Sequence, residues 1–193
     1  MKRVCVFCGS NPGANPAYVQ AARELGAELV KRKLGLVYGG AQVGVMGAVA
    51  DAVLNAGGEV IGVIPEQLKT KEVAHSGLTE LRVVPSMHER KRQMAGLSDG
   101  FIALPGGIGT VEELAEIFTW AHLGIHAKPV GILNVAGYYD HFLKFLDHAV
   151  AERFIKDELR AMLAAADSSP ALLDRFEAYR APATRKWLDA ASS

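Results

Sequence analysis

A glycine-rich segment that follows an apolar run is the first part of the chain that could carry chemistry. It reads Pro105-Gly106-Gly107-Ile108-Gly109-Thr110-Val111-Glu112-Glu113 and leads into a helical pattern. Glycine lets the backbone approach a ligand closely, and the unpaired N–H groups of a helix start attract an anion. Two other apolar runs are followed by similar segments, which place three further residues beside the predicted phosphate: Ser10, Gly39 and Gly40.

The common phosphate-binding motifs do not match these loops. The chain has no G-x-x-x-x-G-K-[ST] sequence, which argues against a P-loop nucleoside triphosphatase, and no G-x-G-x-x-G sequence. Glu112 stands where the dinucleotide fingerprint has its third glycine. Because two carboxylates at the helix start would repel a pyrophosphate lying along it, we expect a single terminal phosphate.

Glu113 has two interpretations. Thr110-x-x-Glu113 is a capping box, in which Thr110 caps the helix and Glu113 bonds back to the N–H of the cap. Alternatively, Glu113 is a functional carboxylate beside the anion site. A cap would not explain the flanking glycines or Pro105, so both interpretations stay open on the residues alone.

The basic segment Met87–Arg92 is similarly ambiguous. A run of charges usually forms a solvated helix face. This helix, however, immediately precedes the apolar run that leads to the glycine-rich segment, so it can lie beside the phosphate loop. Arg90 could then grip a phosphate with two hydrogen bonds, which a lysine cannot do.

The cysteines and histidines do not indicate a metal or redox site. Cys5 and Cys8 are three apart in a strand pattern, so they point to opposite faces, and no second C-x-x-C completes a zinc site. We expect two buried thiols. His122 and His126 are four apart, but no acidic residue completes an H-E-x-x-H motif.

Apolar runs alternate with helical patterns along the chain, which predicts a three-layer α/β/α fold with a central parallel sheet of about seven strands. We expect one domain over residues 1–180 and a C-terminal tail over 181–193. Ligands of such sheets bind at the carboxyl ends of the strands. The predicted strands are 3–8, 36–38, 59–64, 81–84, 100–104, 129–133 and 162–166, and the helices 17–33, 45–55, 87–97, 110–123, 138–153 and 170–179.

The bulk composition limits the classes of partner. The 193 residues include 21 Lys plus Arg and 21 Asp plus Glu. A chain with no net charge has no general attraction to nucleic acid or to an anionic membrane. No apolar stretch resembles a signal peptide or a membrane span. We therefore expect a cytoplasmic protein with a small-molecule ligand.

The combination of Met87-His88-x-Arg90-Lys91 with Pro105-Gly106-Gly107-x-Gly109-Thr110-x-x-Glu113 resembles the signature of the Lonely Guy family. These are cytokinin riboside 5′-monophosphate phosphoribohydrolases, and the similarity extends over nearly the whole chain. It implies a Rossmann-like fold and a homodimer or larger assembly. It also implies hydrolysis of an N6-modified AMP, or of AMP itself, to free base and ribose 5-phosphate, without a metal or organic cofactor.

The resemblance also assigns roles to residues. Arg90 and Glu113 match the catalytic pair. The matching substrate-binding positions are Glu72, Met87, Arg90, Lys91, Gly106, Gly107, Ile108, Gly109, Thr110, Val111 and Glu112. Many relatives carry the label lysine decarboxylase, but no lysine here is singled out for a pyridoxal phosphate Schiff base.

Two alternatives to this function remain. One is a non-enzymatic nucleotide or cofactor carrier on the same fold, since related carriers share the glycine-rich loop. The other is a general AMP nucleosidase, which differs only in its base preference. The helix over 112–125 is apolar around much of its circumference and must be buried on most sides, so we also expect it to contribute to a dimer interface.

Overall fold

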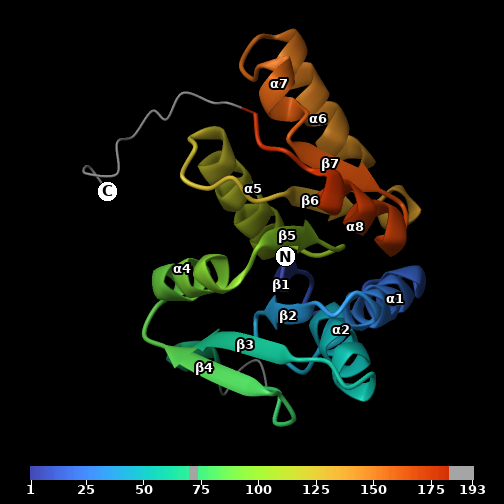
Figure 1. Cartoon of the computed structure of the whole chain (residues 1–193), viewed down its shortest axis with the longest axis vertical. Coiled ribbons are helices and arrows are strands. Elements are labelled where there is room, and N and C mark those ends of the chain that lie inside the picture. The colour runs from blue at the N-terminus through green and yellow to red at the C-terminus, as the bar shows by residue number, and fades with distance from the viewer. Residues whose placement is uncertain (70–73, 183–193) are drawn as a thin grey trace.

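The computed structural model describes residues 1–69 and 74–182 as a central sheet between two layers of helices (Figure 1). All seven strands run parallel, in the order β4-β3-β2-β1-β5-β6-β7. This confirms the predicted three-layer α/β/α fold. The strands are β1 (Arg3–Phe7), β2 (Gly35–Tyr38), β3 (Val60–Pro65), β4 (Glu80–Val84), β5 (Gly100–Ala103), β6 (Val130–Leu133) and β7 (Leu163–Ala166).

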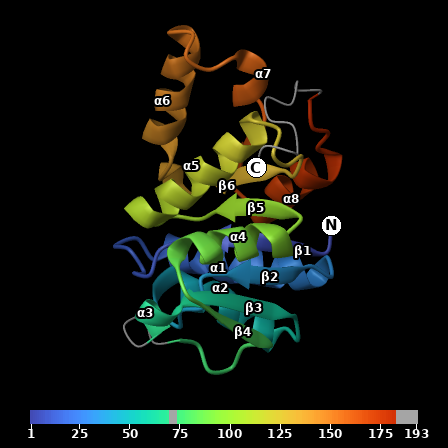
Figure 2. The same ribbon diagram turned by 90° about the vertical axis from the view of Figure 1, so that its left-hand side faces the viewer.

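Helices cover both faces of the sheet. One face packs against α1 (Ala17–Lys31), α2 (Gly44–Asn55) and α8 (Ser169–Ala178). The other packs against α4 (Met87–Leu97), α5 (Ile108–His122) and α6 (Asp140–Ala151). Figure 1 shows α6 beyond β6 and β7, and both views show α4 next to α5 (Figures 1 and 2). Three short helices complete the described part of the chain: α3 (Glu66–Lys69), the 3-10 helix η1 (Val135–Gly137) and α7 (Asp157–Arg160).

The sheet separates two apolar cores, and β1 contributes to both. Cys8 packs in the core beneath α1 and α2, whereas Cys5 packs in the core beneath α4 and α5. Both thiols are buried and free, as the alternation of side chains along a strand predicts.

The order of the strands brings the glycine-rich loops together. β1 lies between β2 and β5, with Phe7 paired to Ala103. The N–H of Gly9 donates to the carbonyl of Pro105 at 3.1 Å, and the N–H of Met46 donates to the carbonyl of Gly9 at 3.2 Å. The loops after β1, β2 and β5 therefore meet at the carboxyl edge, the side of the sheet where the strands end.

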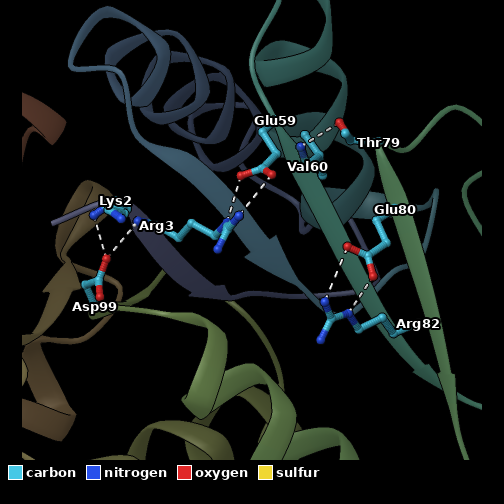
Figure 3. A network of polar contacts seen from close by, with 8 residues as sticks. All are labelled: Lys2, Arg3, Glu59, Val60, Thr79, Glu80, Arg82 and Asp99. Atoms are coloured by element: carbon cyan, nitrogen blue, oxygen red, sulfur yellow. Dashed lines mark hydrogen bonds and ion pairs between the residues drawn. The ribbon is translucent and has the colours of Figure 1, made fainter.

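Charged side chains pair at the amino edge, the side where the strands begin (Figure 3). Arg3 at the start of β1 makes two hydrogen bonds to Glu59, from Nε at 2.7 Å and from Nη2 at 3.1 Å. The Asp99 carboxylate accepts hydrogen bonds from the N–H groups of Lys2 and Arg3. Glu80 accepts from Arg82 at 2.7 Å. The contacts of Arg3 and Asp99 tie the start of β1 to the starts of β3 and β5, whereas the Glu80–Arg82 contact lies within β4.

Several predicted helix ends were wrong. The last helix, predicted to begin at residue 170, begins at Ser169 with Ser168 as its N-cap. The helix expected from Tyr138 begins at Asp140, because a 3-10 turn with Ala136 at φ 50° precedes it. The short helices α3 and α7 were not predicted. The longest helices have 15 residues, and none within the described ranges is long and apolar enough to cross a membrane.

Candidate functional site

A cavity of about 240 Å³ opens at the carboxyl edge, between the ends of the strands and the starts of α4 and α5. Eight of the residues predicted to bind or react with a ligand line it: Ser10, Met87, Arg90, Gly107, Gly109, Thr110, Glu112 and Glu113. Four further described residues that were not predicted as site residues also line it: Cys8, Gly9, Met46 and Leu68. The structure therefore gathers most of the predicted site around one space.

Arg90 and Glu113 face each other in this cavity. Arg90 Nη1 lies 3.6 Å from Glu113 Oε1, and the two side chains are only 6% and 7% exposed. Charges this well buried are tolerated in proteins when they are paired and hydrogen-bonded. The pair comes from two helices, α4 and α5, that the sheet holds on the same face.

The guanidinium of Arg90 is fixed from several directions. Its Nε donates to the carbonyl of Val63 at the end of β3, at 3.1 Å, and its Nη1 lies 4.0 Å from the sulfur of Met87. The first turn of α4 is capped by Ser86, whose Oγ accepts from the N–H of Glu89 at 3.2 Å. Arg90 is thus held at a helix start rather than free in solvent, which excludes the solvated-face interpretation for this residue.

Gly39 and Gly40 do not line the cavity. A Cβ built on Gly39 would collide with Nη2 of Arg90, so this glycine makes room for the guanidinium. Gly40 has φ 83° and packs against Ile64, and its carbonyl accepts from the N–H of His75 at 3.0 Å. Their contribution is to shape the wall behind Arg90.

The start of α5 differs from the predicted capping box. The helix begins at Ile108 with Gly107 in an extended conformation as its N-cap. Thr110 therefore lies inside the first turn, and its N–H bonds to the carbonyl of Gly107 at 3.1 Å. The capping-box interpretation of Thr110 and Glu113 was wrong, because the N-cap is Gly107, three residues before Thr110. Glu113 instead reaches the buried pair with Arg90.

The glycine-rich loop presents backbone donors to the cavity. Among the described residues, none accepts a hydrogen bond from the N–H of Gly107, Ile108 or Gly109. No side chain occupies the space beside Gly107 or Gly109. Unpaired N–H groups at a helix start form an anion site. The side chain of Ile108 itself is 85% exposed, and Gly106 and Val111 are not part of the lining.

Lys91 does not point its ammonium group at the cavity. Its Nζ lies 2.7 Å from Glu112 Oε1 and 3.0 Å from Glu116 Oε1. Burial by itself lowers the pKa of Lys91, but these two hydrogen bonds outweigh it and raise the pKa. Lys91 therefore joins α4 to α5, next to the Arg90–Glu113 pair, and neutralises part of the acidic charge of the α5 start.

Cys8 forms an apolar wall of the site that sequence reasoning had assigned only to the core. Burial first, and then the nearby carboxylate of Glu113, raise the pKa of the Cys8 thiol, while Arg90 opposes them. The thiol therefore stays protonated and is a poor nucleophile. Its position at the carboxyl end of β1 was the available signal, since such positions line ligand sites in parallel sheets.

Glu72, which was predicted to bind the substrate, lies outside the described residues. The two histidines that were considered as metal ligands are engaged with the backbone instead. His122 and His126 each donate a ring N–H to a backbone carbonyl, of Leu159 at 3.2 Å and of Ile117 at 2.9 Å. Within residues 1–69 and 74–182, no three His, Cys, Asp or Glu side chains are grouped to hold a metal ion.

The chain is similar in sequence to a known protein family. Residues 46–176 match the family model described as "Possible lysine decarboxylase". A probable cytokinin riboside 5′-monophosphate phosphoribohydrolase of Oryza sativa subsp. japonica is 57% identical over 178 residues, which cover 92% of this chain and 78% of that protein. A cytokinin riboside 5′-monophosphate phosphoribohydrolase of Arabidopsis thaliana is 52% identical over 178 residues, covering 92% and 84%.

Solved structures share the fold at lower identity. The Moco carrier protein of Chlamydomonas reinhardtii superimposes with a TM-score of 0.69 and 22% identity, covering 92% of this chain and 98% of that chain. The molybdenum cofactor binding protein of Rippkaea orientalis gives a TM-score of 0.68 at 21% identity, covering 92% and 97%. These likenesses show the fold alone.

Proposed function

The chain belongs to the Lonely Guy family of cytokinin riboside 5′-monophosphate phosphoribohydrolases, and from that premise we propose how its own residues perform the hydrolysis. The substrate is an N6-modified adenosine 5′-monophosphate, and AMP is a second candidate. The products are the free base and ribose 5-phosphate. The observation that carries the proposal is the buried Arg90–Glu113 pair beside unpaired N–H groups of a helix start.

The start of α5 binds the 5′-phosphate in this proposal. The N–H groups of Gly107, Ile108 and Gly109 donate to the phosphate oxygens, and the positive end of the helix dipole favours the anion. Ser10 on the loop after β1 lines the same cavity and offers a hydroxyl. Holding the phosphate here fixes the ribose relative to Glu113, one turn further along α5, and so lowers the entropic cost of reaction.

Glu113 and Arg90 act on the glycosidic bond. Breaking the bond from C1′ to the base nitrogen develops positive charge on the ribose. The Glu113 carboxylate stabilises that charge and orients the water that attacks C1′. The bond's electron pair leaves with the base. The attacking water adds its oxygen to C1′ and gives a proton to Glu113, and Glu113 returns this proton through solvent to the departing base, which restores the carboxylate. Arg90 holds the carboxylate in place and donates hydrogen bonds to the substrate.

We also propose a homodimer in the cytoplasm. On α5, Leu114, Ile117 and Phe118 are buried in the core, but Ala115 is exposed and Trp120 is only half-buried. A second copy covering this side would complete the burial that the apolar pattern requires. Light scattering at micromolar protein concentration tests this, and a monomer would contradict it. The free, buried thiols are compatible with a reducing compartment.

The test of the reaction is a chromatographic assay for free base. The purified protein is incubated with isopentenyladenosine 5′-monophosphate, with AMP, and with each unphosphorylated nucleoside. We expect base from a monophosphate and none from the nucleosides, and the ratio of the two rates distinguishes a cytokinin-activating enzyme from a general AMP nucleosidase. Binding of the nucleotides without release of base would overturn the proposal and favour the carrier alternative.

A further inference from the structure

Two adjacent tyrosines hold the back of the glycine-rich loop. The hydroxyl of Tyr139 donates to the carbonyl of Leu104 at 2.7 Å, and that of Tyr138 donates to the carbonyl of Gly106 at 2.6 Å. Between them, the carbonyl of Pro105 accepts from the N–H of Gly9 at 3.1 Å. Three consecutive carbonyls of the loop are therefore all occupied from outside the loop.

Occupying a carbonyl also orients the N–H of the same peptide group. In a planar trans peptide the C=O and the N–H point in opposite directions. The Gly106 carbonyl points at Tyr138, so the N–H of Gly107 points away from it. Gly107 also lines the cavity that holds Arg90 and Glu113, and no described residue accepts from its N–H. Tyr138 thus determines the direction of a donor in the anion site.

The two tyrosines differ in what they orient. The carbonyl that Tyr139 holds belongs to the peptide between Leu104 and Pro105, and proline has no N–H. Tyr139 is 2% exposed, and burial raises the pKa of its hydroxyl, so it stays a donor inside the core. Its bond fixes the end of β5 without aiming any donor at the cavity.

Tyr138 lies outside the core and beside the loop. Its side chain is 40% exposed, and its ring meets Tyr18 edge-on with centroids 5.4 Å apart. Both rings line a second cavity of about 270 Å³ on the other side of Gly106 and Gly107. The hydroxyl of Tyr18, by contrast, makes no hydrogen bond to any described residue. Tyr18 and Tyr138 therefore line the same cavity with their rings in contact, but only Tyr138 makes a hydrogen bond to the loop.

The turn that presents Tyr138 is itself fixed. Asn134, just after β6, accepts from the N–H of Tyr139 at 2.8 Å and donates its side-chain N–H to Asp140 at 2.7 Å. Ala136 and Gly137 adopt positive φ angles of 50° and 71°, which turns the chain back toward the loop. The turn that carries Tyr138 is thus anchored at the end of β6, the strand next to β5.

We propose that Tyr138 is a positioning residue for the substrate's 5′-phosphate, acting through the Gly106–Gly107 peptide. The inference rests on the proposed function, because it assigns the anion at this loop to the nucleotide. It distinguishes Tyr138, which orients a phosphate donor, from Tyr139, which stabilises the fold.

Three variants that each remove one hydroxyl and keep the ring test this role: Tyr138→Phe, Tyr139→Phe and Tyr18→Phe. Tyr138→Phe removes the bond to the Gly106 carbonyl and leaves the Gly107 N–H free to turn away from the phosphate. Because a hydrogen bond to a charged group is then weakened, we expect KM for the monophosphate to rise about tenfold, while kcat changes less than about threefold. Inhibition by ribose 5-phosphate should weaken by the same factor, and inhibition by free adenine should not change. Tyr18→Phe should match the wild type in all of these.

Tyr139→Phe should give the reverse pattern. It leaves the buried carbonyl of Leu104 without a donor, so we expect a lower melting temperature with little change in KM. If both tyrosines only stabilised the fold, both variants would show a higher KM together with a lower melting temperature, and this outcome would contradict the proposal. Unchanged KM in Tyr138→Phe, or an equal weakening of ribose 5-phosphate and adenine, would overturn the proposal.

Calorimetric binding separates this inference from the proposed reaction. The dissociation constants for AMP and adenosine are measured on the wild type and on Tyr138→Phe. We expect the variant to lose affinity for AMP by about tenfold and to keep its affinity for adenosine. This measurement tests the positioning role of Tyr138 even if the wild type releases no base. Equal loss for both ligands would remove the phosphate-specific role.

Discussion

The carboxyl and amino edges of the sheet both carry arginine–glutamate pairs, but in different surroundings. At the carboxyl edge, Arg90 and Glu113 are 6% and 7% exposed, with Nη1 and Oε1 3.6 Å apart. At the amino edge, Arg3 and Glu59 make a closer contact of 2.7 Å with exposures of 34% and 42% (Figure 3). The looser pair is therefore the buried one.

This difference separates stability from function. An exposed pair contributes at most about 1 kcal/mol, because water screens it and its side chains lose entropy. A buried pair is costly to desolvate, and removing one partner leaves an uncompensated charge. The Arg3–Glu59 pair has the better hydrogen-bond geometry and is partly exposed, whereas the Arg90–Glu113 pair is buried in the cavity that the glycine-rich loop lines. We therefore interpret the buried pair as a functional rather than a stabilising feature.

The largest effect is expected for Glu113→Gln at the carboxyl edge. The substitution keeps the shape of the side chain but removes the charge that stabilises the developing cation on the ribose. We expect kcat to fall by about 10²–10⁴-fold, while the dissociation constant for AMP changes little. The measurement is steady-state base release together with calorimetric binding. Near-normal turnover would return Glu113 to a structural role.

A smaller effect is expected when a methyl group displaces Arg90. In Gly39→Ala the new Cβ would collide with Nη2 of Arg90, so the guanidinium must shift. We expect kcat to fall by about 10–100-fold, as small displacements of positioning groups do. Gly96→Ala is the matched control, because it lies on α4 with Arg90 and its Cβ would meet nothing within 4 Å. Equal kcat in both variants would contradict the packing argument.

A several-fold effect is expected from the tie between α4 and α5. Lys91→Met removes both contacts to Glu112 and Glu116, and Glu116→Gln weakens one of them. If Lys91 acts by joining the helices, each variant lowers kcat by about two- to fivefold. Because both variants affect the same contact, the loss in the double variant should be smaller than the product of the two single losses. A rise in KM confined to Lys91→Met would instead indicate direct contact with the substrate.

The smallest effect is expected at the amino edge, in Asp99→Asn. Burial by itself raises the pKa of Asp99, but the N–H groups of Lys2 and Arg3 outweigh it and lower the pKa below its ordinary value. The charged form therefore stabilises the fold above about pH 4, and this contribution disappears as the pH falls through the lowered pKa.

Denaturant unfolding across pH measures this contribution. Because the carboxylate is largely exposed, we expect Asp99→Asn to lose less than about 1 kcal/mol at pH 7, with the difference from the wild type shrinking toward pH 3. The kcat of the variant should equal that of the wild type. A difference that grows as the pH falls, or a loss of kcat, would remove the contrast between the two edges.

Much of the local structure was determined by the sequence alone. Uninterrupted apolar runs predicted seven parallel strands, and the helical pattern of Met87–Leu97 predicted α4 with its observed ends. The glycine-rich segments predicted which strand ends carry the site. These signals are local, because periodicity and the absence of glycine and proline act within a few residues. They were sufficient to find Arg90 and Glu113 as candidates.

Only the tertiary structure decided what each candidate meets. Gly39, a predicted substrate-binding residue, leaves the space that Nη2 of Arg90 occupies. Lys91, another predicted substrate-binding residue, contacts Glu112 and Glu116 and so links α4 to α5. The capping box at Thr110 was wrong because Gly107 could start the helix earlier. These outcomes depend on the strand order, which places β2, β1 and β5 side by side; contacts between segments far apart in the chain leave no periodic signal in either segment.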